Sequence, residues 1–278
     1  MDRQRPVRKC RMCGKVKKLC YSHYLPRGLY LFARAAELKN PNPVMSVNGE
    51  LKQISDQYQD YLLCESCEGR LSALGEKWVL ANLPTSYGAE FPLHKVLEPI
   101  TPKLIEERVN VYDVSGVEAF DMRKLVYFGL SVFWRGGVHD WKTRSGLRAP
   151  RVGLGSHEEP IRKFLLDDEP LPKGLTIAIN VWPYRPVLPL VHPVVQEQMP
   201  DCSRYWFYVP GLHFFLFAGP SIPQDAKGSD ATTGVVAVDL DAADSLHAFI
   251  KSAIKTHSRG PKIEGMFKEI AAIRAGQE

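Results

Sequence analysis

Two short cysteine pairs, CRMC at residues 10–13 and CESC at residues 64–67, limit more than any other feature what this chain can fold into. In a C-x-x-C pair both thiolates can reach one ion from a tight turn, and two such pairs complete the tetrahedral site of a structural zinc ion. Disulfide bonds are the alternative, but they are less expected because no secretory signal is visible at the N-terminus. We therefore predict that Zn²⁺ is bound by Cys10, Cys13, Cys64 and Cys67.

The residues around the pairs predict a small unit that depends on the metal. Gly14 suits the turn that closes the first pair, and the second pair begins a predicted helix over residues 65–83. This helix has apolar residues at helical spacing, namely Leu71, Leu74, Trp78 and Val79. A cysteine turn, a short hairpin and a second pair entering a helix form a treble-clef organisation, in which the metal replaces a core that so small a segment cannot build. The other two thiols, Cys20 and Cys202, are expected to be buried.

A further pattern lies between the pairs, with SHYLP at residues 22–26 and QDYLLCESC at residues 59–67. With this H-x-x-P strand and this apolar strand entering the second pair, residues 8–80 resemble zinc-bearing HNH endonucleases. They look most like a divergent HNH-like branch seen in uncharacterised bacterial proteins. In HNH enzymes a histidine activates water against the scissile phosphate, and a divalent ion stabilises the developing charge. The resemblance implies that His23 is the general base.

The resemblance also implies what surrounds His23. The preceding position, commonly a metal ligand in the family, is Ser22, and the histidine that usually follows the second pair is replaced by Glu68. Glu68 with water molecules is an acceptable weak ligand set for Mg²⁺, and Asp56 or Asp60 could add a second oxygen. The residues alone leave other roles open. His23 is equally expected as a hairpin anchor, and Glu68 fits better as a first-turn carboxylate favoured by the helix dipole.

Positive charge is concentrated near the N-terminus, although the net charge of the chain is only +5. Between Met1 and Cys20 there are eight Lys and Arg residues and one acidic residue, Asp2. Such a segment attracts a phosphate backbone through the release of counterions, while a solvated tail is the alternative. We expect DNA or RNA as the partner, contacted by Arg11, Lys15, Lys17, Lys18 and Arg70. For Arg70 a plain surface position is equally expected.

Two features outside the HNH-like segment also bear on function. The stretch at residues 139–151 gathers basic residues around Trp141, which can follow a phosphate backbone and stack a base, although a plain surface loop is slightly favoured. Residues 122–137 are apolar nearly all round and predict a buried helix, with Asp121 as its N-cap. Arg135 in this helix should need an acidic partner or a cage of carbonyls.

The whole sequence predicts an α+β fold in two domains: a zinc-binding HNH-like domain at residues 1–83 and an α+β domain of unknown role at residues 84–278. In the second domain we expect a small antiparallel sheet with strands at residues 109–114, 175–182, 204–219 and 234–240. Terminal helices are predicted at residues 242–257 and 262–274.

Two functional hypotheses follow. The first is a Mg²⁺-dependent endonuclease with His23 as the base and Glu68 at the metal. The second is a zinc module that has lost its catalytic metal and serves as an adaptor for nucleic acid or for a partner protein. No apolar stretch is long enough to span a bilayer, so we expect a soluble, cytoplasmic protein without a membrane partner.

Overall fold

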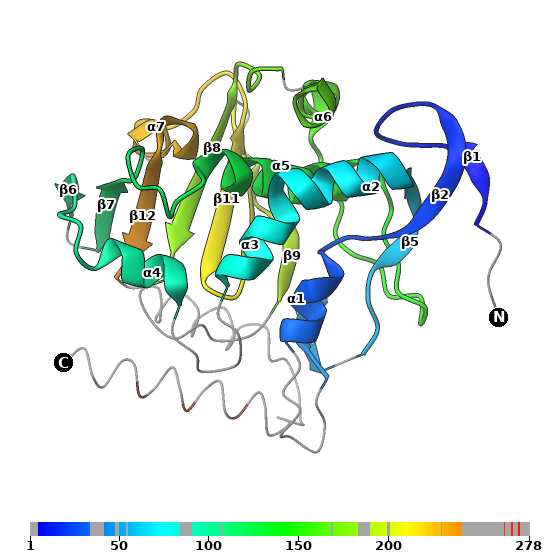
Figure 1. The fold of residues 1–278 in the computed structure, drawn as a ribbon, viewed down its shortest axis with the longest axis horizontal. Helices are drawn as coiled ribbons and strands as arrows, with labels where there is room; N and C mark the ends of the chain where they lie inside the picture. Colours follow the sequence, from blue (N-terminus) through cyan, green and yellow to red (C-terminus); the bar gives the residue numbers. More distant parts are fainter. Residues whose placement is uncertain are drawn as a thin grey trace.

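The chain has an α+β fold, as the sequence predicts, with its two larger sheets at opposite ends of the molecule (Figure 1). The computed structural model describes residues 5–33, 42–47, 50–53, 55–83, 91–106, 108–167, 169–182, 190–198, 201–228 and 230–240, with positions 264, 268 and 272. The predicted terminal helices therefore lie outside the described residues, except for three helical positions, Glu264, Lys268 and Ala272.

A three-stranded antiparallel sheet forms the base of the N-terminal unit, in the order β1-β2-β5. Its strands are β1 (Val7–Lys9), β2 (Val16–His23) and β5 (Gln59–Cys64). The connection between β2 and β5 holds α1 (Arg27–Phe32) and a separate hairpin of β3 (Val44–Val47) and β4 (Glu50–Gln53). β5 then leads directly into a helical segment of α2 (Glu65–Leu71), η1 (Ser72–Glu76) and α3 (Lys77–Asn82), which confirms the helix expected at 65–83.

The middle of this helical segment, η1, is π-helical. It lies against α5 (Met122–Val138), the longest helix among the described residues. Gly75 makes the close approach possible, because a Cβ at this position would lie 3.0 Å from the backbone nitrogen of Phe128. The absence of a side chain at Gly75 therefore sets how closely the N-terminal unit packs on α5.

A seven-stranded sheet forms the second unit, in the order β6-β7-β12-β8-β11-β10-β9. Its neighbouring strands are antiparallel except β12 and β8, which are parallel. The strands are β6 (Leu104–Ile105), β7 (Val109–Asp113), β8 (Leu175–Val181), β9 (Val191–Gln198), β10 (Ser203–Val209), β11 (Leu212–Ala218) and β12 (Val235–Asp239).

The sheet is larger than the small antiparallel sheet expected from the sequence, and one of its strand pairs is parallel. Two edge strands account for the difference in size. β9 contains Pro193, which is tolerated at a sheet edge but interrupts the strand pattern in the sequence. β6 has only two residues, too few to show any alternation.

Helix α5 is the buried central helix that the sequence predicts, and it packs against the seven-stranded sheet (Figure 1). Asp121 caps it by accepting a hydrogen bond from the backbone N–H of Lys124 at 3.1 Å. A Cβ at Gly129 would lie 2.7 Å from Ile177 and 2.8 Å from Phe214, so this glycine lets α5 approach β8 and β11. The remaining helices are α4 (Pro92–Leu97), η2 (Gly155–His157), α6 (Glu158–Asp167), α7 (Gln224–Gly228) and η3 (Ala231–Thr233).

One cluster of buried hydrophobic side chains runs through both units, from Cys10 and Leu71 to Phe128 and Ile177. The domain boundary predicted after residue 83 stays a prediction, while the core is continuous across it. None of the helices in the described part of the chain has the length and apolar character needed to cross a membrane.

We predict that Gly75→Ala lowers the free energy of unfolding by about 1–3 kcal/mol, because the added methyl group would press on the backbone of Phe128. Gly69→Ala is the matched control, since a Cβ there meets nothing within 4 Å. It should leave stability unchanged or raise it by about 0.5–1 kcal/mol through helix propensity. Urea denaturation followed by circular dichroism measures both variants, and equal effects would contradict a tight contact between η1 and α5.

Candidate metal centre and the His23 cleft

The four cysteines of the two pairs form one cluster, as the sequence predicts. The sulfur atoms of Cys10, Cys13, Cys64 and Cys67 all lie within 4.8 Å of one another. The first pair sits on a tight turn between β1 and β2, in which Gly14 (φ 72°) donates its N–H to the carbonyl of Cys10 at 2.9 Å. The second pair spans the junction of β5 and α2. The cluster can hold a metal ion, and four thiolates are a donor set typical of structural zinc.

Hydrogen bonds to sulfur favour the thiolate form of Cys10. The thiol of Cys67 lowers the pKa of Cys10 to about 4, with help from backbone N–H groups and against the effect of burial. The N–H of Cys64 lies 3.3 Å from the Cys10 sulfur. The same contact with Cys10 raises the pKa of Cys67. A metal ion would displace the proton of Cys67, because a coordinating thiol is bound as thiolate.

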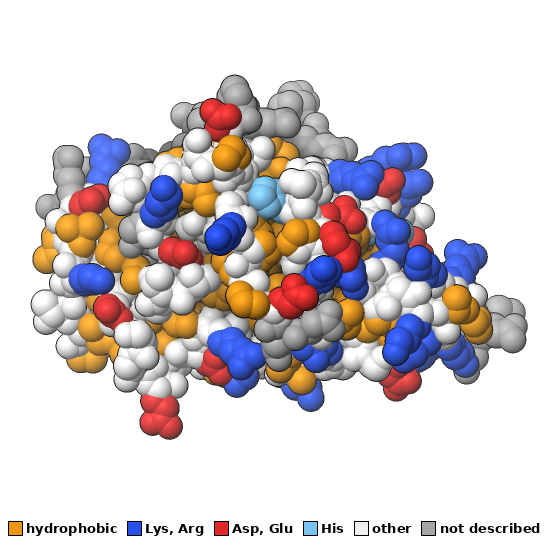
Figure 2. Space-filling view, turned by 90° about the horizontal axis from the view of Figure 1, so that it is seen from above, with side chains coloured by type: hydrophobic (Ala, Val, Ile, Leu, Met, Phe, Trp, Pro, Cys, Tyr) orange, Lys and Arg blue, Asp and Glu red, His pale blue; other side chains and the backbone are white. Residues whose placement is uncertain are grey.

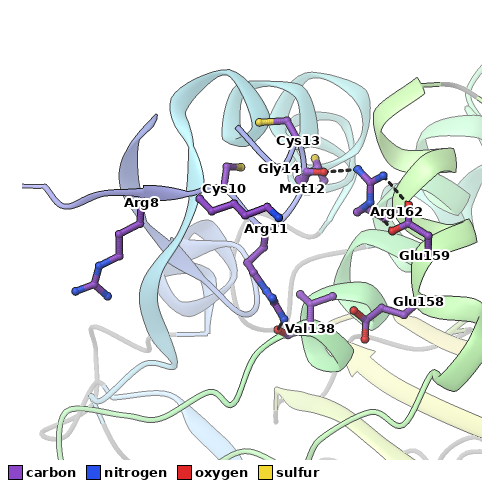
Figure 3. A pocket seen from close by; sticks show the side chains of 11 residues that line it. Arg8, Cys10, Arg11, Met12, Cys13, Gly14, Val138, Glu158, Glu159 and Arg162 are labelled. Atoms are coloured by element: carbon purple, nitrogen blue, oxygen red, sulfur yellow. Dashed lines mark hydrogen bonds and ion pairs between the residues drawn. The ribbon is translucent and has the colours of Figure 1, made fainter. Parts of the chain in front are cut away.

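The first cysteine turn (residues 10–14) is attached to the second unit by arginines (Figure 3). Arg11 donates to the carbonyl of Val138 at 2.7 Å, at the end of α5. Arg162 of α6 donates to the carbonyl of Met12 and is held in place by a two-fold ion pair with Glu159, with both N–O distances 2.7 Å. A groove of about 580 Å³ lies between the turn and α6. These contacts from the second unit thus help to position and orient the cysteine turn.

The residues predicted to contact nucleic acid fall into two groups. Arg11 and Arg70 donate to backbone carbonyls of the second unit, Arg70 to Leu165 at 2.8 Å, so both hold the two units together. Lys15, Lys17 and Lys18 are exposed on the hairpin of β1 and β2. Figure 2 shows Lys and Arg side chains gathered at the end of the molecule where this hairpin lies in Figure 1. The role of these three lysines in binding stays a prediction.

His23 ends β2 and is half-buried at a cleft of about 540 Å³. Burial, together with the positive charges of Arg27 and Arg135, lowers the pKa of His23, so its imidazole is neutral at neutral pH. The other residues that line this cleft are Tyr21, Arg27, Ser55, Asp56, Gln57, Gln59 and Arg144. We call it the His23 cleft.

Glu68 does not line the His23 cleft. Its carboxylate accepts a short hydrogen bond from the hydroxyl of Ser22, which is buried and accepts the N–H of Leu63 at 3.2 Å. Successive residues of a strand point to opposite faces, so Ser22 and His23 diverge from β2. Burial raises the pKa of Glu68, although Arg135 and Ser22 act against it. The structure thus joins Glu68 to Ser22, the two positions at which the resemblance implies metal ligands.

The two aspartates considered as additional ligands contact the loop at residues 139–151. Asp60 Oδ2 lies 3.0 Å from His139 Nε2, and Asp56 accepts the N–H of Ser145 at 3.0 Å. Trp141 in this loop is buried, its ring stacked on Tyr24 at 5.3 Å between centroids. The prediction that Trp141 could stack a base is therefore wrong, because the ring is already covered.

Arg135 has the acidic partner that the sequence predicts. Its guanidinium forms a buried ion pair with Glu76 of η1 and lies 3.4 Å from the carbonyl of Tyr24. Sequence reasoning missed Glu76, and it also missed Arg27 and Arg162. Each is one charged residue among many on a helix, and the sequence carries no signal for which one faces a site.

Fold and site together define the class: an α+β protein with a tetracysteine cluster able to hold a metal ion. Comparison with known proteins adds no family to this description, because no protein-family model, curated protein or solved structure matches the chain. The resemblance of residues 8–80 to HNH endonucleases therefore stays a prediction.

We predict that Glu76→Ala lowers the free energy of unfolding by about 3–5 kcal/mol, because it leaves the charge of Arg135 buried without its carboxylate. Glu65→Ala, at an exposed position of the same helical segment, should change stability by less than about 0.5 kcal/mol. Guanidinium denaturation measures both. Similar values for the two variants would mean that water reaches Arg135 and that the ion pair is not buried in solution.

Proposed function

We propose that this protein is a zinc-stabilised, HNH-like nucleic-acid-binding protein whose ancestral catalytic metal site is lost. In this proposal Cys10, Cys13, Cys64 and Cys67 hold Zn²⁺, and the ion fixes the hairpin of β1 and β2 in position. The hairpin contacts the phosphate backbone. The tetrathiolate donor set supports zinc, because soft thiolates in a tetrahedral arrangement favour it.

The positive charges on the hairpin are the main support for this proposal. Arg8 of β1 lies directly opposite Lys17 of β2 in the antiparallel register, and every residue of β1 is exposed. Like charges directly opposite each other destabilise a strand pair. The exposed Lys9, Lys15 and Lys18 add to this repulsion. A bound polyanion reduces this repulsion and releases its own counterions. A phosphate backbone is therefore the partner that the surface of the hairpin fits best.

The contacts of the acidic groups favour binding over catalysis. Hydrolysis of the HNH type needs a divalent ion beside the histidine base. Glu68 hydrogen-bonds to Ser22 instead of facing His23, and Asp60 pairs with His139. Asp56 is the one carboxylate among the residues lining the His23 cleft, and it accepts the N–H of Ser145. Neutral His23 would be a competent base, but the described residues place no group of metal ligands beside it.

The test compares the wild type with a variant that combines Lys15→Gln, Lys17→Gln and Lys18→Gln. The matched control carries Lys77→Gln, Lys103→Gln and Lys173→Gln, which remove the same charge at exposed positions elsewhere. Binding of labelled duplex DNA is measured by fluorescence anisotropy between about 50 and 200 mM salt. The hairpin variant should bind at least about tenfold more weakly than the wild type. The slope of log affinity against log salt concentration should fall by up to about 0.9 per lysine, while the affinity of the control should stay within about twofold of the wild type.

Two results would overturn the proposal. Absence of binding by the wild type to both duplex and single-stranded DNA at low salt would remove nucleic acid as the partner. Cleavage of plasmid DNA or RNA in Mg²⁺ or Mn²⁺ that is lost in His23→Ala would show that the site is catalytic.

A further inference from the structure

The His23 cleft is formed by both units of the protein. Tyr21, His23 and Arg27 come from β2 and α1, whereas Arg144 reaches the cleft from the loop at residues 139–151. Arg27 and Arg144 are both exposed, and in the described part of the chain neither guanidinium makes a hydrogen bond or an ion pair. Two uncommitted guanidinium groups in one cleft are a typical arrangement for binding a phosphate.

The loop that carries Arg144 is held rigidly. Trp141 anchors the start of this loop. Its ring is buried against Tyr24 and donates its N–H to the carbonyl of Arg135 at 2.8 Å. At its tip, Gly146 (φ 87°) donates to the carbonyl of Thr143 at 3.1 Å. Asp56 accepts the N–H of Ser145 at 3.0 Å and so fixes the residue next to Arg144 to the cleft wall. The side chain of Arg144 is thus presented by a preorganised backbone.

The wall beside the guanidinium groups is suited to a nucleobase. Tyr21 lines the cleft, and its ring packs on Tyr61 with 5.0 Å between centroids, which holds it in place. Gln59 adds a side-chain amide, which carries one donor group and one acceptor as a base edge does, while the side chain of Gln57 hydrogen-bonds to His23. A volume of about 540 Å³ lies within the range of small-molecule sites.

We propose that the His23 cleft binds one nucleotide of an unpaired strand, with its phosphate between Arg27 and Arg144 and its base against Tyr21. This inference rests on the proposed function and names its substrate class: single-stranded nucleic acid. A base in a duplex is stacked on both sides and paired at its edge, so it cannot reach the Tyr21 ring without leaving the helix. An unpaired base pays no such cost and stacks readily on an aromatic ring.

The experiment measures binding of labelled oligothymidine and of a duplex of equal length by fluorescence anisotropy. The test variants are Arg27→Ala, Arg144→Ala, Tyr21→Phe and Tyr21→Leu. Arg148→Ala is the matched control, because Arg148 is exposed in the same loop, pairs with Lys142 in the backbone register and does not line the cleft. Excess mononucleotide is added in a separate titration to distinguish a strand from a free nucleotide as the ligand.

The wild type should prefer the single strand. Arg27→Ala and Arg144→Ala should each weaken its binding by about tenfold and reduce the salt slope by about 0.7, with the duplex affected at most about twofold. Tyr21→Leu should weaken binding without changing the salt slope, and Tyr21→Phe should retain it, because the ring and not the hydroxyl contacts the base. Arg148→Ala should stay within about twofold on both ligands. Excess mononucleotide should reduce binding of the strand only weakly.

Equal effects of Arg144→Ala and Arg148→Ala, or equal loss of single-strand and duplex binding, would overturn the inference. Displacement of the strand by low mononucleotide concentrations would also overturn it and make a free nucleotide the ligand. If the wild type binds neither oligonucleotide, the proposed function fails as well. If the hairpin lysines matter and Arg144 does not, the proposed function stands and the cleft assignment alone fails.

Discussion

The constraint on which the N-terminal unit depends is a cluster of four cysteine sulfur atoms, brought together by the turn between β1 and β2 and by the junction of β5 and α2. The hairpin that carries the first pair buries only part of its apolar residues: Met12 and Leu19 lie in the core, whereas Val7 and Val16 are 67% and 70% exposed. The apolar area that this hairpin buries therefore comes from few side chains. The sulfur cluster joins the hairpin to the junction of β5 and α2. A metal ion bound there would stabilise this contact.

Hydrogen bonds from arginine side chains to backbone carbonyls connect the N-terminal unit with the second unit. Arg11 and Arg162 connect the first cysteine turn with α5 and α6, and Arg70 connects α2 with α6. Arg135 is buried between the units and neutralised by Glu76. Guanidinium groups suit this task because they remain charged and present several donors in a fixed plane. Exposed cations also lie on the hairpin and at the His23 cleft, which is where we place the nucleic acid.

Local patterns in the sequence were sufficient to predict the cysteine cluster, the helix that follows it and the buried α5, because each depends on spacing within a short segment. The cost of burying a charge predicted that Arg135 has an acidic partner, but it did not identify Glu76 as that partner. Features that depend on tertiary contacts were missed. Trp141 resembles a base-stacking residue until Tyr24 covers it, and Glu68 resembles a metal ligand until Ser22 binds it. Strand β9 was not predicted, because Pro193 argues against a strand unless that strand is known to lie at a sheet edge.

The most direct test of this account is zinc-edge X-ray absorption spectroscopy on the purified wild-type protein, combined with elemental analysis. The account predicts about one zinc ion per chain, coordinated by four sulfur atoms at about 2.3 Å. Absence of tightly bound zinc, or a zinc ion with nitrogen or oxygen ligands in place of sulfur, would contradict it, because the hairpin would then have to be held in position by some other interaction.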